Sequence, residues 1–198
     1  MVPTIEDLRK ARDLFEKNEP RDLFYRVATE LVALAIDGKS SLSTAEALAV
    51  LLQTWNASYY RYRHFTAAHF GDLERIVGDH EDALRTFRAR SVTTLCEQDS
   101  DPVKRTFREF ELVLHPVGAA KCLHLLAPGF FPLWDRAIAA AYGVPLAGLG
   151  RNQEGYWQFM TVVREQCNRL ASEGSSMNLL KALDEFNYCK YTKKWIKE

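Results

Sequence analysis

Apolar residues recur along this chain at the spacing of helix faces, and this periodicity constrains the fold more than any other feature. One such face comprises Leu23, Phe24, Val27, Leu31 and Leu34. A second comprises Leu48, Leu51, Leu52, Trp55 and Tyr59. Leucine and alanine are abundant, whereas isoleucine, valine and threonine are sparse and rarely alternate with polar residues, so the pattern favours helices over strands.

Start and stop signals divide the chain into about ten helices joined by short connections. Thr4 caps a first helix that Pro20 ends, and Ser43 or Thr44 starts a third with Glu46 positioned for a capping box. We expect further helices near 73–77 and over 79–95, 102–114, 119–126 and 135–142, then one carrying 157–170 and a last one carrying 179–186. The predicted fold class is therefore all-α.

The charge balance limits the ways in which this chain can bind nucleic acid. Lys plus Arg total 26 and Asp plus Glu total 26, so the formal net charge is zero. This argues against proteins that coat nucleic acid or bind it through basic tails, because they rely on an overall excess of positive charge. A local basic face would have to gather Arg61, Arg63, Arg88, Lys104 and Lys121 on one side of the fold. The acids to be turned away from that face are Glu74, Asp82, Glu109 and Glu111.

The remaining composition is that of an ordinary globular domain, with 47% apolar and 26% charged residues. The apolar runs are too short to cross a bilayer, and the charged segment 1–17 does not fit a signal peptide. The spacing of Cys96, Cys122, Cys167 and Cys189 fits neither a zinc finger nor an iron–sulfur motif, so we interpret them as reduced thiols. We therefore expect a cytoplasmic monomer with no membrane partner, no metal and no cofactor.

Lys121 and Asp135, which lie 14 positions apart, are the strongest candidates for chemistry. Residues 115–118 predict a tight connection, and the amide groups that follow Gly118 at the start of a helix would suit a phosphate. Lys121 falls on the first turn of that helix, where a cation is unfavourable without a specific role. Asp135 follows Pro132 and opens the next helix. N-capping alone would explain Asp135, and a solvated surface position would explain Lys121.

This order of residues resembles the helix–hairpin–helix DNA glycosylase superfamily, whose endonuclease III-like and oxoguanine glycosylase-like members carry Pro-Gly-Val-Gly-x-Lys, an apolar helix and a catalytic Asp. The matching segments here are Pro116-Val-Gly-Ala-Ala-Lys121 and Phe131-Pro-Leu-Trp-Asp135. Upstream, Ala49-Val-Leu-Leu-Gln53-Thr-Trp-Asn56 is similar to the family helix that reaches into the duplex. The resemblance covers roughly residues 25–145. The single hairpin glycine and the absence of a four-cysteine iron–sulfur loop indicate a divergent member.

The resemblance implies a single two-lobed domain over residues 1–198, with a cleft between the lobes. Residues 40–145 would form the lobe with the hairpin, and residues 1–39 and 146–198 would pack together as the second lobe. It also implies an enzyme that flips a damaged or modified base out of double-stranded DNA and hydrolyses its N-glycosidic bond. Asp135 would stabilise the positive charge that develops on the sugar. Lys121 would either form a Schiff base, which adds AP-lyase activity, or only contact phosphate.

The resemblance and the residue types together select two further groups of candidates. Candidates for DNA contact are Gln53, Arg61, Arg63, Arg88, Pro116, Val117, Gly118 and Ala119. Candidates for the base pocket are Trp55, Asn56, Tyr59, Tyr60, His124 and Trp134. Aromatic rings between arginines suit stacking on an extruded base and contact with the DNA backbone. A buried aromatic stripe explains Trp55 equally well, and a satisfied core histidine explains His124.

Two other function classes stay open at this point. One is a non-catalytic DNA-binding module of the same fold, and the other is an α-helical protein–protein adaptor in which the hairpin and Asp135 are structural. The salt dependence of DNA binding separates the adaptor from the other two, because phosphate contacts weaken as salt rises. The C-terminal run 190–197 is either a basic aromatic edge near DNA or a solvated terminus.

Overall fold

The computed structural model describes residues 2–56, 60–61, 64–173 and 177–197. All regular secondary structure in these residues is helical, which confirms the predicted all-α class. In chain order the α-helices are α1 (Ile5–Asn18), α2 (Asp22–Ile36), α3 (Thr44–Thr54), α5 (Ala67–Asp79), α6 (Glu81–Arg88), α7 (Ser100–Leu126), α8 (Arg136–Ala141), α9 (Gln153–Ser172) and α10 (Leu179–Asn187). Two 3-10 turns, η1 (Val92–Thr94) and η2 (Glu97–Asp99), precede α7, and a π-helical turn, η3 (Tyr188–Thr192), follows α10.

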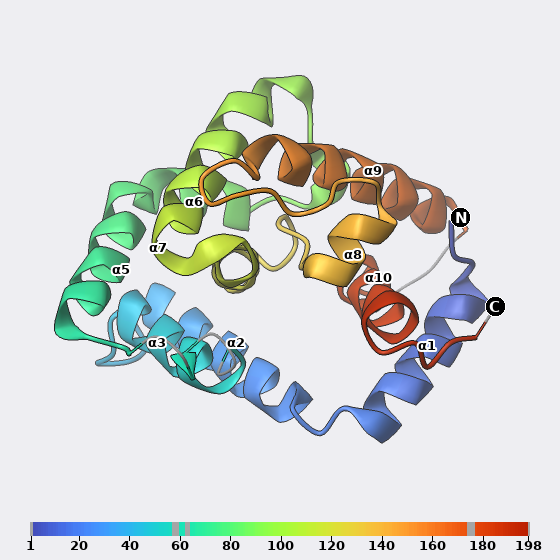
Figure 1. The fold of residues 1–198 in the computed structure, drawn as a ribbon, viewed down its shortest axis with the longest axis horizontal. Helices are drawn as coiled ribbons and strands as arrows, with labels where there is room; N and C mark the ends of the chain where they lie inside the picture. Colours follow the sequence, from blue (N-terminus) through green and yellow to red (C-terminus); the bar gives the residue numbers. More distant parts are fainter. Residues whose placement is uncertain (1, 57–59, 62–63, 174–176, 198) are drawn as a thin grey trace.

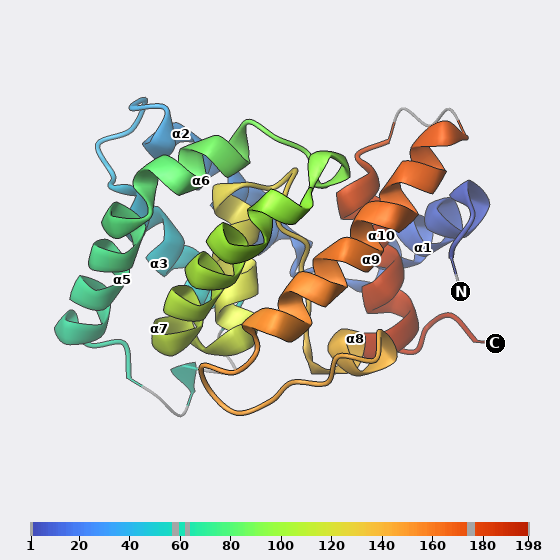
Figure 2. The ribbon, with the colours of Figure 1, turned by 90° about the horizontal axis from the view of Figure 1, so that it is seen from above.

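Helix α7 runs through the middle of the molecule, between two groups of helices (Figure 1). Helices α2, α3 and α5 lie on one side, and α1, α8 and α10 lie on the other. Helix α9 packs along α7, and the two termini lie at the same end of the molecule, beside α1 (Figure 2). Helix α1 contacts α10, whereas α2 contacts α3 and α7. The lobe boundary expected near residue 39 therefore separates two helices that pack against each other.

Local sequence signals set the starts of two helices. Thr4 and Asp7 form a capping box at the start of α1, and Ser43 and Glu46 form another at the start of α3. In each box a hydroxyl accepts from a backbone amide while a carboxylate accepts from the amide of the cap residue. These predicted starts are confirmed, since each cap depends only on residues that are three apart in the chain.

The helix predicted over residues 79–95 is shorter than expected, because α6 ends seven residues earlier. The Val92 amide donates a hydrogen bond to the Gly129 carbonyl at 2.7 Å. Arg90 forms an ion pair with Asp99 at 2.6 Å, where both side chains are largely buried. These contacts with residues beyond the helix replace the hydrogen bonds that a continuous helix would have. The spacing of apolar residues in the sequence does not reveal such contacts.

The tight connection predicted at residues 115–118 is a single-residue kink inside α7. His115 has φ 60° and ψ 166°, and Pro116 continues the helix directly. Proline suits the first position of the new helical segment, because its fixed φ is helical and its missing N–H has no partner there. Gly118 does not turn the chain as predicted but lies inside the helix, where an added Cβ would stand 3.3 Å from Asn56 Nδ2. The glycine therefore permits close packing.

Replacing His115 by glycine is expected to stabilise the fold. A non-glycine residue at this φ and ψ carries about 1–3 kcal/mol of backbone strain, which glycine removes. Part of this gain is offset, because glycine loses more chain entropy on folding than other residues do. We expect His115→Gly to raise the melting temperature by about 2–4 °C, which corresponds to about 1 kcal/mol for a chain of this size. His115→Ala is the matched control, because it removes the imidazole and keeps the Cβ. Equal melting temperatures for the two variants would contradict the strain at His115.

A buried segment, residues 130–134, carries the chain across the core to the start of α8. Phe131 is fully buried, and Trp134 packs edge-to-face on Tyr156 with ring centroids 5.1 Å apart. The Tyr156 hydroxyl donates a hydrogen bond to the Pro132 carbonyl at 2.8 Å. Because this segment is held on both sides, the residue that follows it, Asp135, occupies a fixed position at the surface of the core.

Candidate functional site

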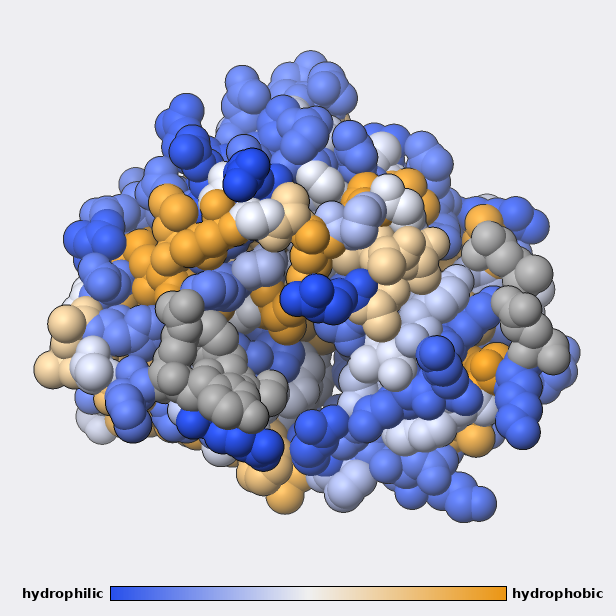
Figure 3. Space-filling view, in the orientation of Figure 1, coloured by the Kyte–Doolittle hydropathy of each residue, from blue (hydrophilic) through white to orange (hydrophobic). Residues whose placement is uncertain are grey.

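A pocket of about 120 Å³ lies where the α1–α2 corner, the kinked end of α7, the start of α8 and helix α10 meet. Its walls are Phe15, Glu19, Arg21, Asp22, Trp55, Val117, Lys121, Leu133, Trp134, Asp135, Ile138, Lys181, Asp184 and Tyr188. The surface is hollowed near the middle of this face, between α2 and α10 (Figure 3). Lys121 and Asp135, the two residues predicted to carry chemistry, thus line one pocket together with Trp55, Val117 and Trp134.

Lys121 lies in the second turn after the kink rather than in the first, and its side chain is directed at the end of α3. Its Nζ donates hydrogen bonds to the Trp55 carbonyl at 2.8 Å and to Asn56 Oδ1 at 3.4 Å. The same Nζ stands 4.7 Å from the centre of the Trp55 ring. Burial lowers the pKa of Lys121 to about 8, with a further contribution from Arg21 and an opposing one from Asp135.

Asp135 is the N-cap of α8, and both of its carboxylate oxygens are held. Oδ1 accepts hydrogen bonds from the amides of Ala137 at 2.8 Å and Ile138 at 2.9 Å. Oδ2 accepts from the Thr192 hydroxyl at 2.6 Å. Asp135 therefore has the structural role of a helix cap, and it also lies on the wall of the pocket. Thr192, which belongs to η3, escaped sequence reasoning because it lies far along the chain.

The capping role of Asp135 predicts an ordered set of stabilities. Asp135→Ala removes the acceptor for two α8 amides and is expected to cost about 1–2 kcal/mol of unfolding free energy. Asp135→Asn keeps an oxygen that can accept from those amides, so its cost is expected to be smaller. Thr192→Val is the control that removes only the bond to Oδ2. Urea denaturation midpoints measure all three, and an Asp135→Ala variant as stable as the wild type would contradict the cap.

Helix α10 supplies two charged pocket residues that the sequence reasoning missed. Lys181 Nζ lies 3.5 Å from Asp22 Oδ1, 3.9 Å from Asp184 Oδ2 and 3.4 Å from Glu185 Oε1. Burial acts to lower the pKa of Lys181, but the surrounding carboxylates outweigh it and raise the pKa. Burial raises the pKa of Asp184 to about 7, and Lys181 opposes this shift. In the sequence these residues have the spacing of a solvated helix face, so no local pattern distinguishes them.

A second polar cluster joins the C-terminal segment to the α1–α2 corner. Arg21 Nε forms an ion pair with Glu19 Oε1 at 2.7 Å, and the Tyr188 hydroxyl donates to Glu19. The hydrogen bond from Arg21 lowers the pKa of Glu19 to about 2, with Tyr188 contributing. Trp195 packs edge-to-face against Tyr188, with ring centroids 6.1 Å apart. Trp195 of the 190–197 run is thus packed beside the pocket residue Tyr188, while Lys193, Lys194 and Lys197 of the same run are exposed.

His124 lies in the core and not among the residues that line the pocket. Its Nδ1 is 2.8 Å from the Phe131 carbonyl, which can only accept, so Nδ1 carries the proton. Its Nε2 then accepts from the Tyr25 hydroxyl at 2.9 Å. Burial lowers the pKa of His124 to about 4, so the ring is neutral near pH 7. His124 is therefore a core histidine with a hydrogen-bond partner on each ring nitrogen, and it does not line the base pocket.

The other base-pocket candidates are divided between two places. Asn56 is buried and accepts from Lys121 Nζ, directly beside the pocket. Tyr60 instead hydrogen-bonds His69 Nε2 at 2.7 Å and lines a different hollow with His64. Tyr59 and Arg63 lie outside the described residues.

The candidates for DNA contact do not form one surface. Gly118 and Ala119 are buried, so they do not present amide groups to a phosphate as predicted. Pro116 contributes its carbonyl, which accepts from Trp134 Nε1 at 3.4 Å. Arg88 donates to the Leu126 carbonyl at 2.9 Å and thereby caps the end of α7. Gln53 and Arg61 are both exposed, and neither lines the pocket.

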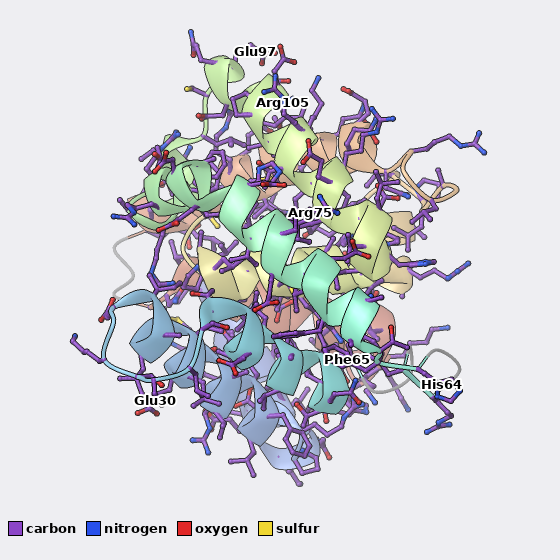
Figure 4. The ribbon with its side chains drawn as sticks, turned by 90° about the vertical axis from the view of Figure 1, so that its left-hand side faces the viewer. Glu30, His64, Phe65, Arg75, Glu97 and Arg105 are labelled. Carbon is purple, nitrogen blue, oxygen red and sulfur yellow. The ribbon has the colours of Figure 1, made fainter. Side chains whose placement is uncertain are left out.

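A chain with no net charge would need a local basic face to bind DNA. In the described part of the chain, the basic residues predicted for that face do not lie together. Lys104 forms an ion pair with Glu154 at 3.2 Å, and the partly buried Lys121 hydrogen-bonds the Trp55 carbonyl. Of the acids, Glu109 pairs with His80 at 2.8 Å. Glu111 is fully buried and accepts from the Gly150 amide at 2.8 Å. Figure 4 shows acidic and basic side chains on one and the same face, where Glu30 and Glu97 are labelled together with Arg75 and Arg105.

Comparisons with family models, with curated proteins and with solved structures found no match to this chain. In the part of the chain that the structure describes, no helix has the length and apolar content needed to span a bilayer. Among the same residues, no group of three or more His, Cys, Asp or Glu side chains is arranged to hold a metal ion.

Proposed function

We propose that the pocket cleaves an N-glycosidic bond of a damaged or modified nucleotide that has been flipped out of duplex DNA. The observation that carries the proposal is the presence of a partly buried lysine amine and a fixed carboxylate on the walls of one pocket. The amine can attack the sugar carbon of the glycosidic bond as a nucleophile. The carboxylate can stabilise the positive charge that develops on the sugar. The aromatic side chains of Trp55 and Trp134 border the same pocket and suit contact with a base.

The surroundings of Lys121 favour its neutral form as the attacking species. A neutral amine has two N–H bonds and one lone pair, and the two acceptors, Trp55 O and Asn56 Oδ1, match the two N–H bonds. The lone pair then remains for the sugar carbon. With a pKa of about 8, roughly a tenth of the side chains are neutral at pH 7, compared with far fewer for a solvated lysine.

Asp135 acts electrostatically in this proposal. As the base departs, positive charge develops on the deoxyribose, and a carboxylate held by three donors stabilises it without reorganising. The amine of Lys121 bonds to the sugar carbon, the bond to the base breaks, and its electron pair leaves with the base. The nitrogen then loses a proton, the bond between the sugar carbon and the ring oxygen breaks as the C=N bond forms, and the ring oxygen takes up a proton. This yields a Schiff base between Lys121 and the sugar, from which strand cleavage can follow.

Borohydride trapping tests this function. We expect the wild type to form a covalent adduct with a duplex that contains an abasic site, and to excise a base from at least one duplex carrying uracil, hypoxanthine, an N-methylated guanine or an oxidised guanine. Lys121→Met should abolish the adduct, because it replaces the amine with an apolar chain of similar length. Lys181→Arg is the matched control, since it keeps the second buried cation and removes only its primary amine.

The pH dependence of the adduct gives a second readout. Protonation removes the lone pair of Lys121, so adduct formation should fall roughly tenfold for each unit below pH 8. Adduct formation that survives Lys121→Met would reject the assigned nucleophile. Absence of both excision and adduct with the wild type, with DNA still bound, would favour a binding module of the same fold, whereas absence of binding at low salt would favour the adaptor.

A further inference from the structure

Asp184 on α10 faces the same pocket as Lys121 and Asp135, although it comes from a different part of the chain. Its side chain is only 12% exposed, and its nearest cation is Lys181, whose Nζ lies 3.9 Å from Asp184 Oδ2. That cation is shared, because Lys181 is also 3.4 Å from Glu185 and 3.5 Å from Asp22. One ammonium group therefore faces three carboxyl groups, and Asp184 shares its nearest cation with two other acids.

The two pocket carboxyl groups have opposite surroundings. Two backbone amides and one hydroxyl donate to Asp135, so its two oxygens act as acceptors in all three hydrogen bonds. Asp184 is desolvated, and its charged neighbours are Lys181 and Glu185 on its own helix, Lys121 on α7 and Asp135 at the start of α8. Burial raises the pKa of Asp184 to about 7, the two lysines oppose the shift, and the two acids add to it. Two carboxyl groups in different surroundings commonly divide the roles of an active site.

We propose that Asp184 is the general acid that protonates the departing base, a role that rests on the function proposed above. The carboxyl O–H bond of Asp184 breaks and its proton goes to a ring nitrogen or oxygen of the base. At the same time the bond between the sugar carbon and the base nitrogen breaks, and its electron pair stays on the base. The neutral amine of Lys121 forms the new bond to that carbon. The resulting Asp184 carboxylate recovers a proton from the Lys121 nitrogen, which carries a positive charge once it has formed its bond to the sugar carbon.

The experiment separates loss of the base from attack on the sugar. We expect Asp184→Asn to slow excision of the base by about a hundredfold or more, because the amide cannot release a proton. The same variant should still form the borohydride-trapped adduct with a duplex that already contains an abasic site, since no base has to leave there. Glu185→Gln is the comparison variant, because it removes a carboxylate from Lys181 on the same helix while Asp184 keeps a proton that it can donate. Glu185 contributes to the raised pKa of Asp184, so we expect Glu185→Gln to slow excision, but far less than Asp184→Asn does.

A wild-type pH profile keeps the proposal testable even if Asp184→Asn fails to fold. Excision needs Asp184 protonated and Lys121 neutral, so its rate should peak between pH 7 and pH 8 and fall on both sides. Adduct formation at the abasic site should keep rising through pH 8, because it depends on the neutral form of Lys121 and not on the proton of Asp184.

The outcomes distinguish this inference from the proposed function. Excision by Asp184→Asn at the wild-type rate, or a wild-type excision rate that rises steadily through pH 8, would overturn the role of Asp184 and leave the function intact. A wild type that forms no adduct with the abasic duplex and excises no base would overturn the function itself. Equal losses of excision and adduct in Asp184→Asn would assign Asp184 to the support of Lys121 and reject the proton transfer.

Discussion

The break of the backbone at His115 is the constraint on which the pocket depends. It lets α7 change direction within one residue, so that the segment after Pro116 approaches the end of α3. Gly118 permits this approach, because a larger residue would meet Asn56. Lys121, one turn further on, then reaches the Trp55 carbonyl.

Burial of charge is the second common feature of the site. Desolvation lowers the pKa of Lys121 to about 8 and raises the pKa of Asp184 to about 7, so the two groups change protonation close to neutral pH. Lys181 stays charged because it is surrounded by carboxyl groups. Such an arrangement costs stability, since each buried charge loses its hydration. The same loss of hydration produces the neutral amine and the protonated acid that the proposed reaction would use.

The scattered surface charge bears on how DNA would be held. Arg88, Lys104 and Lys121 all bond to other parts of the protein, so few of the predicted basic residues are left for phosphate. An enzyme of this kind would bind undamaged duplex weakly and with a small salt dependence, because few counterions are released. Its selectivity would then come from the extruded nucleotide in the pocket rather than from the grip on the backbone.

The sequence by itself determined the helical class, the two capping boxes, the cap at Asp135 and the choice of Lys121 and Asp135 as a pair. These features depend on residues within about a turn of one another or, for the pair, on a short motif. Only the tertiary structure decided that Asp184, Lys181 and Thr192 join that pair, that Gly118 and Ala119 are buried, and that His124 belongs to the core. The physical reason is that helix periodicity reports which side of a helix is apolar but not which distant helix covers it.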